Sequence, residues 1–124
     1  MTRIRHARAQ KAQARADFAH DRGKDRSAAL RALTMGQPVV YAIRTQLGDI
    51  KIGCSTQLDR RRHQFGTNAE ILAFTPGDFD AEAEIHERLQ QYRSRGHEYY
   101  HPTPEVLAVV NEMRDYFSLP HLSE

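Results

Sequence analysis

VVYAIRTQLGDIKIGC, residues 39–54, has the pattern of two short strands joined by a tight turn. β-Branched and aromatic residues fill both halves, and Gly48 suits the left-handed position of a three-residue loop over residues 46–48. This loop would pair Tyr41 with Gly53 and place both on one sheet face with Lys51. The opposite face, which we expect to pack on the core, carries Val40, Ala42, Ile50 and Ile52.

The elements after this hairpin set the fold class. We expect a helix over about residues 57–65, a third strand over 70–75 and an amphipathic helix over 78–93. A short extended segment, EYYH, and a last helix that Thr103 caps and Pro104 begins would follow. This order predicts an α+β fold, a small three-stranded antiparallel sheet flanked by helices.

The composition fits one soluble globular domain. The chain has 124 residues, 40% of them hydrophobic, and a single cysteine, Cys54. One cysteine excludes an internal disulfide framework and a Cys-based zinc cluster, and it favours a reducing, cytoplasmic location. No apolar run approaches the ~20 residues that span a bilayer, so we expect no membrane partner.

Charge divides the chain into unequal parts. Residues 1–34 carry nine Lys and Arg against three Asp, whereas residues 35–124 carry nine against 13 acidic residues. We therefore expect a basic, helical Arg/Ala-rich arm over residues 1–37, a folded domain over 38–118 and a tail over 119–124. The arm suits phosphate polymers. A solvated helix without a partner is the alternative, and three aspartates argue against an organelle transit peptide.

The helix over residues 57–65 carries three consecutive arginines. At 100° per residue, Arg61 and Arg62 flank the apolar stripe that joins Leu58 to Phe65, while Arg60 lies nearly opposite. An arginine beside a buried face is satisfied by a carboxylate, offered to a ligand anion, or laid over apolar surface with its charge in water. The spacing leaves all three readings open.

Glu82 and His86 form a second candidate site on the helix over residues 78–93. They are four residues apart, so they share one helix face beside the apolar stripe. A carboxylate and an imidazole at this spacing can bind a divalent metal, support acid–base chemistry, or have a structural role. Tyr41 taken alone suits a buried core tyrosine.

Together these motifs resemble the GIY-YIG nuclease superfamily. Nine residues separate Tyr41 of VVYAIR from Lys51 of KIG, and Arg61 stands eight residues after Gly53. The later EAEIHERL and RSRGHEYY resemble the phage- and bacterial-type branch, often described as DNA-binding, with its K-I-G second motif and E-x-x-x-H helix. Val39 replaces the first motif's glycine, and the asparagine of many superfamily nucleases has no counterpart.

The resemblance implies roles for these residues. Glu82 would hold one Mg²⁺ or Mn²⁺ against a phosphate oxygen, and the metal and Arg61 would stabilise the charge that develops on phosphorus. Tyr41, acidified by the cation, would help to deprotonate the attacking water, with Lys51 as an electrostatic aid. The role of His86 is open. Gly53 would leave room for the phosphate, while Arg60 and Arg62 would contact the DNA backbone.

We therefore expect a divalent-metal-dependent DNA endonuclease that hydrolyses phosphodiester bonds. A DNA-binding module of the same fold that does not cut is the alternative, and a protein-interaction or structural role is a third. The retained tyrosine, arginine and glutamate favour the enzyme. Cleavage of both strands would call for a homodimer or a partner protein, and the sequence does not choose between them.

Overall fold

The computed structural model describes residues 37–66 and 68–123, without the side chains of Asp59, Arg62 and His63. Its strands are β1 (Val39–Arg44), β2 (Ile50–Ser55), β3 (Glu70–Pro76), β4 (Arg93–Arg95) and β5 (Tyr99–Tyr100). Its helices are α3 (Leu58–Arg61), α4 (Phe79–Leu89) and α5 (Pro104–Tyr116), with the 3-10 turns η1 (Arg62–Phe65) and η2 (Gln90–Tyr92). The arm expected over residues 1–37 lies, except for residue 37, outside the described residues.

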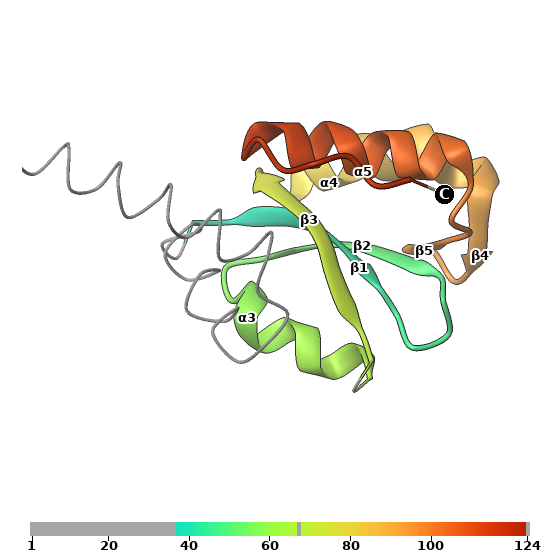
Figure 1. Cartoon of the computed structure of the whole chain (residues 1–124), viewed down its shortest axis with the longest axis horizontal. Helices are drawn as coiled ribbons and strands as arrows, with labels where there is room; N and C mark the ends of the chain where they lie inside the picture. The colour runs from blue at the N-terminus through green and yellow to red at the C-terminus, as the bar shows by residue number, and fades with distance from the viewer. Residues whose placement is uncertain (1–36, 67, 124) are drawn as a thin grey trace, which may run out of the picture.

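The described residues form an α+β fold around an antiparallel sheet (Figure 1). Within them the sheet has five strands in the order β3-β1-β2-β5-β4. The expected α+β class with an antiparallel sheet is confirmed, whereas the expected number of three strands is wrong. Strands β4 and β5 are three and two residues long, too short for an alternating pattern to reveal them.

The β1–β2 hairpin has the expected register. Tyr41 pairs with Gly53 and Ile43 with Lys51. Thr45 donates its N–H to the carbonyl oxygen of Asp49 at 2.8 Å, and Gly48 has the left-handed φ of 94° that the three-residue loop needs.

Asp49 fixes the loop end of this hairpin to β4. Its carboxylate accepts hydrogen bonds from the hydroxyl groups of Thr45 and Ser94 and from Arg95, whose Nε lies 2.7 Å away. Burial by itself would raise the pKa of Asp49, but the hydrogen bonds from Arg95, Thr45 and Ser94 outweigh it and lower this pKa. The charged form of Asp49 therefore stabilises the fold.

Helices α4 and α5 cover one face of the sheet, and α3 lies against the other (Figure 1). The α4–α5 side holds the four residues expected to face the core, together with Leu89 of α4 and several α5 side chains. These expected core residues are Val40, Ala42, Ile50 and Ile52, each no more than 1% exposed.

The second face of the sheet is also packed. Tyr41 lies in a cluster with Ile43 of β1, Leu58 of α3, Phe117 and Leu119, and its exposed fraction is 2%. The sheet face that carries Tyr41 is therefore largely core, in addition to the face that we expected to pack on it. The phenol is held by its neighbours and does not lie free in a cleft.

The helices begin near the expected residues, and two of them end in a 3-10 turn. The helix expected over residues 57–65 is α3 followed by η1, and the one expected over 78–93 is α4 followed by η2. Asp78 caps α4 by accepting hydrogen bonds from the N–H groups of Asp80 and Ala81. Thr103 caps α5 and Pro104 begins it, as expected.

The segment after α5 packs back onto the domain. The buried Arg114 donates hydrogen bonds to the carbonyl oxygens of Leu72 in β3 and of Pro120, the latter at 2.5 Å. The Asn111 amide exchanges two hydrogen bonds with the main chain of Leu122, at 3.2 and 2.7 Å. Among the described residues, no helix has the length and apolar character to cross a membrane.

Candidate functional site

The phenol of Tyr41 lies across the bare backbone of Gly53. A Cβ atom built at Gly53 would lie 2.4 Å from the Tyr41 hydroxyl oxygen and 2.5 Å from Cζ, far inside van der Waals contact. The paired register thus brings Tyr41 and Gly53 together, and the phenol occupies the space that a side chain would take. The room that we expected Gly53 to leave for a phosphate is filled by Tyr41.

Tyr41 and Lys51 lie between a carboxylate and a guanidinium. Burial raises the pKa of Tyr41 to about 12; the Arg61 charge lowers it and the Glu82 charge raises it. Burial likewise lowers the pKa of Lys51, which the Glu82 charge raises and the Arg61 charge lowers. Both Glu82 and Arg61 are therefore close enough to act on the same two strand residues.

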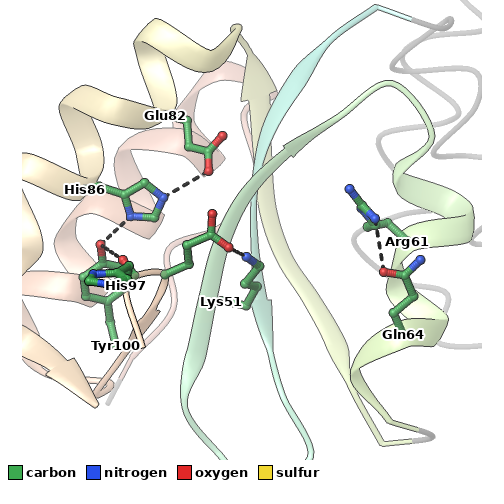
Figure 2. A network of polar contacts seen from close by, with 8 residues as sticks. Lys51, Arg61, Gln64, Glu82, His86, His97 and Tyr100 are labelled. Atoms are coloured by element: carbon green, nitrogen blue, oxygen red, sulfur yellow. Dashed lines mark hydrogen bonds and ion pairs between the residues drawn. The ribbon is translucent and has the colours of Figure 1, made fainter. Parts of the chain in front are cut away.

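Glu82 belongs to a chain of polar contacts that begins on α4. Its Oε1 lies 3.1 Å from Nε2 of His86, and Nδ1 of the same imidazole contacts the hydroxyl of Tyr100 (Figure 2). A neutral imidazole satisfies both contacts if Nε2–H donates to Glu82 and Nδ1 accepts from Tyr100. Glu82 is 8% exposed, so this hydrogen bond orients a buried carboxylate.

Glu98, just before β5, completes this cluster. Its carboxylate forms an ion pair with Lys51. One ligand atom from each of Glu82, His86 and Glu98 lies within 4.8 Å of the others. Two donors at about 2.1 Å from one ion are at most about 4.2 Å apart, so a small inward shift would bring the group onto one divalent cation.

The donor types fit a hard divalent cation. Two carboxylates suit Mg²⁺ and Mn²⁺, and an imidazole is compatible with Mn²⁺. Both carboxylates already have positive or donating neighbours, Lys51 at Glu98 and His86 at Glu82. A bound cation would therefore compete with the Lys51 ammonium for Glu98.

The arginines of the α3 region do not all reach this cluster. Arg61 lies on the far side of the strands from Glu82, and its Nη1 donates to Oε1 of Gln64 at 3.2 Å (Figure 2). Arg60 is exposed, one residue before it, and both line an open pocket next to the start of α4. The side chain of Arg62 lies outside the described part of the chain.

The sequence predicted one site built from Tyr41, Lys51, Arg61, Glu82 and His86. It gave no role to Glu98, Tyr99 or Tyr100. No sequence pattern indicated Glu98, because its contact with Lys51 follows from the pairing of β5 with β2. Lys51 lies opposite Tyr99 in the β2–β5 ladder, so its side chain reaches both Glu98 and the Tyr99 ring, whose centroid is 5.3 Å from Nζ.

Comparison with known families gives one match. A model of the T5orf172 domain matches residues 39–118, which run from the first residue of β1 to just beyond α5. The chain belongs to the T5orf172 domain family. This finding corrects the assignment to the GIY-YIG nuclease superfamily, which rested on four short motifs. No curated protein and no solved structure matches the chain.

The T5orf172 match spans every element of the candidate site. It includes the β1–β2 hairpin, α3, α4 and the Glu98–Tyr100 segment. The basic segment before residue 39 lies outside it. The residues that the structure gathers therefore belong to the family domain itself.

Proposed function

We propose that this T5orf172 domain acts on DNA as a divalent-metal-dependent endonuclease, with Glu82 at its centre. The observation that carries the proposal is the placement of Glu82. It is a buried carboxylate, oriented by His86, whose charge acts on Tyr41 and Lys51 from one side while Arg61 acts on them from the other. Membership of the T5orf172 family is compatible with a role on DNA.

Burial makes a structural explanation of Glu82 less favourable. Removing a carboxylate from water is costly unless a cation or hydrogen bonds compensate it. Within the described residues, Glu82 forms a hydrogen bond with His86 and no ion pair with Lys or Arg. A divalent cation would supply the missing charge. We therefore assign Glu82 and Glu98 as its ligands and His86 as the residue that positions Glu82.

The bound cation would contribute Lewis-acid stabilisation of negative charge on a phosphate oxygen. The other groups have roles that their positions support. Lys51, once Glu98 is engaged elsewhere, can direct its ammonium toward a phosphate, and Arg61 can approach the same phosphate from the opposite side. Burial raises the pKa of Tyr41 to about 12, so its phenol is protonated at neutral pH.

A DNA-binding module that does not cut is the second candidate, and one observation favours it. The cluster is satisfied without a metal, because Lys51 neutralises Glu98 and His86 donates to Glu82. Such a site would hold its geometry in a protein that only binds. The two functions share the basic surface around Arg60 and Arg61 and differ in the need for Glu82.

Plasmid DNA with Mg²⁺ or Mn²⁺ separates these two functions. Glu82→Gln keeps the shape of the side chain and removes its charge, and Glu84→Gln on the exposed side of α4 is the matched control. We expect the Glu82 variant to lose about 10²-fold or more in cleavage rate and the control to cut like wild type. Calorimetry with Mn²⁺ should show weaker metal binding for the Glu82 variant alone.

Two results would contradict the endonuclease. Cleavage that is undiminished in Glu82→Gln would show that another group, or a contaminant, does the chemistry. If wild type and variant both shift DNA with a salt-sensitive affinity and neither cuts it, the binding module is correct.

A further inference from the structure

The pocket beside Arg61 is separate from the carboxylate cluster. It has a volume of about 610 Å³ and opens between α3 and the first residues of α4. This volume lies within the range of about 300–1,000 Å³ typical of small-molecule sites. Arg60 and Arg61 line it on the α3 side, and Asp78 and Phe79 line it on the α4 side.

Phe79 gives the α4 side of the pocket an exposed aromatic ring. The ring is the first residue of α4 and is 77% exposed, more than any other large hydrophobic side chain among the described residues. The Asp78 cap fixes the backbone immediately before it. A single exposed hydrophobic residue is common on protein surfaces, so the argument depends on what lies across from this one.

The opposite wall is basic. Arg60 and Arg61 are both exposed, and within the described residues no carboxylate forms an ion pair with either of them. Exposed guanidinium groups bind phosphate with two parallel hydrogen bonds. Asp78 on the other wall disfavours a phosphate there, so a bound anion would take the α3 side.

One basic wall and one aromatic wall match the two ends of a nucleotide. A phosphate fits the arginines and a base fits a face-on contact with a phenyl ring. The side-chain amides of Gln57 and Gln64 line the same pocket and can exchange hydrogen bonds with a base edge. Arg61 also acts on Tyr41 and Lys51, so the pocket adjoins the proposed catalytic residues.

We infer that this pocket takes one unpaired base of a DNA strand, stacked on Phe79, with the adjoining phosphate on Arg60 and Arg61. A base inside a duplex is stacked on its neighbours and would have to leave the helix to reach the ring. The substrate class is therefore DNA with an unpaired nucleotide, such as a bulge, a flap or a single-stranded stretch. This inference rests on the proposed action on DNA and adds which DNA is selected.

Binding measured in EDTA tests the pocket apart from catalysis. The probes are a fluorescent DNA duplex, the same duplex with a one-nucleotide bulge, and a third in which the bulged nucleotide is abasic. The proteins are full-length wild type, Phe79→Ala, Phe79→Trp, and Leu47→Ala as the control. Leu47 is 76% exposed at the tip of the β1–β2 hairpin, so its truncation matches that of Phe79 in exposure.

Wild type should bind the bulged duplex about tenfold more tightly than the plain duplex, the gain expected from one stacked base. Phe79→Ala should lose this preference, Phe79→Trp should keep it, and Leu47→Ala should behave like wild type. The abasic bulge should bind wild type and Phe79→Ala equally, because the ring then has no base to stack on.

Four results would overturn the inference. Equal binding of the bulged duplex by wild type and Phe79→Ala would leave the ring without a role. A uniform loss on all three probes, together with a lower unfolding midpoint, would make Phe79 a structural residue. The absence of a bulge preference in wild type, or tighter binding of an RNA of the same sequence, would assign the pocket to another ligand.

The test also distinguishes the pocket from the proposed chemistry. If wild type cuts DNA but Phe79→Ala selects bulged DNA as wild type does, the pocket fails and the endonuclease stands. If the bulge preference depends on Phe79 but no metal supports cleavage, the catalytic proposal fails and the pocket stands.

Discussion

Replacing Gly53 with alanine tests the contact on which the arrangement of Tyr41 depends. The new methyl group would lie 2.4 Å from the Tyr41 hydroxyl oxygen, 2.5 Å from Cζ and 3.0 Å from Cε1. The phenol cannot move aside freely, because its ring is packed in a buried cluster with Leu58 and Phe74. Inserting a methyl group into a packed core costs about 1–3 kcal/mol.

A smaller effect has the opposite sign. Alanine in a strand is favoured over glycine by about 0.5–1 kcal/mol, because an unfolded chain with alanine has less conformational freedom to lose on folding. We therefore expect Gly53→Ala to lower the free energy of unfolding by about 1–2 kcal/mol. For a domain of this size, the melting temperature should fall by about 4–8 °C for each kcal/mol.

Urea and thermal unfolding, followed by circular dichroism, measure this change in two backgrounds. In wild type Gly53→Ala should destabilise, but in Tyr41→Leu, which has no ring to reach Gly53, it should be neutral or stabilise by about 0.5 kcal/mol. A change smaller than about 0.5 kcal/mol in wild type would refute the reasoning, and so would the same loss in both backgrounds. Either result would mean that the Tyr41 ring does not lie over Gly53.

Two further predictions concern polar side chains that stabilise the fold. Asp49→Asn should destabilise by about 1–3 kcal/mol at pH 7 by weakening the hydrogen bond from Arg95. Because the pKa of Asp49 is lowered from 3.8, its charge stabilises the fold fully above pH 3.8, and this stabilisation is lost as the pH falls through the folded-state pKa. The free energies of unfolding of wild type and Asp49→Asn, measured in urea, should therefore converge in acid. Arg114→Leu should cost about 2–4 kcal/mol in the same assay by removing the donor to two main-chain carbonyl groups, whereas Arg88→Ala, which breaks an exposed pair with Glu112, should cost less than about 1 kcal/mol.

The β1–β2 hairpin was predictable because local rules determine it. Gly48 permits one loop conformation, and that loop sets the pairing of Tyr41 with Gly53. The burial of both faces has a weaker signal in the sequence of β1. Val39, Tyr41 and Ile43 are as apolar as the residues between them, and a continuous apolar run indicates a strand covered on both sides.

The remaining parts depended on information that short patterns lack. β4 and β5 are too brief to show periodicity, and the place of Glu98 follows only from the pairing of β5 with β2. The family assignment was wrong because four short motifs specify few positions, whereas the match to the T5orf172 domain extends over residues 39–118. The motifs still identified residues of the candidate site, since the structure brings several of them together.

The short length of β5 explains how groups from opposite sheet faces meet. β5 pairs with β2 only at Ile50 and Lys51, and one more hydrogen bond joins Ile52 to Glu98. Beyond that point, within the described residues, the last part of β2 pairs only with β1. Glu82 of α4 approaches this free edge from one face, while the Tyr41 phenol crosses Gly53 from the other. A longer β5 would cover the edge and separate the carboxylate from the phenol. The site therefore depends on where the fifth strand stops as much as on the residues that line it.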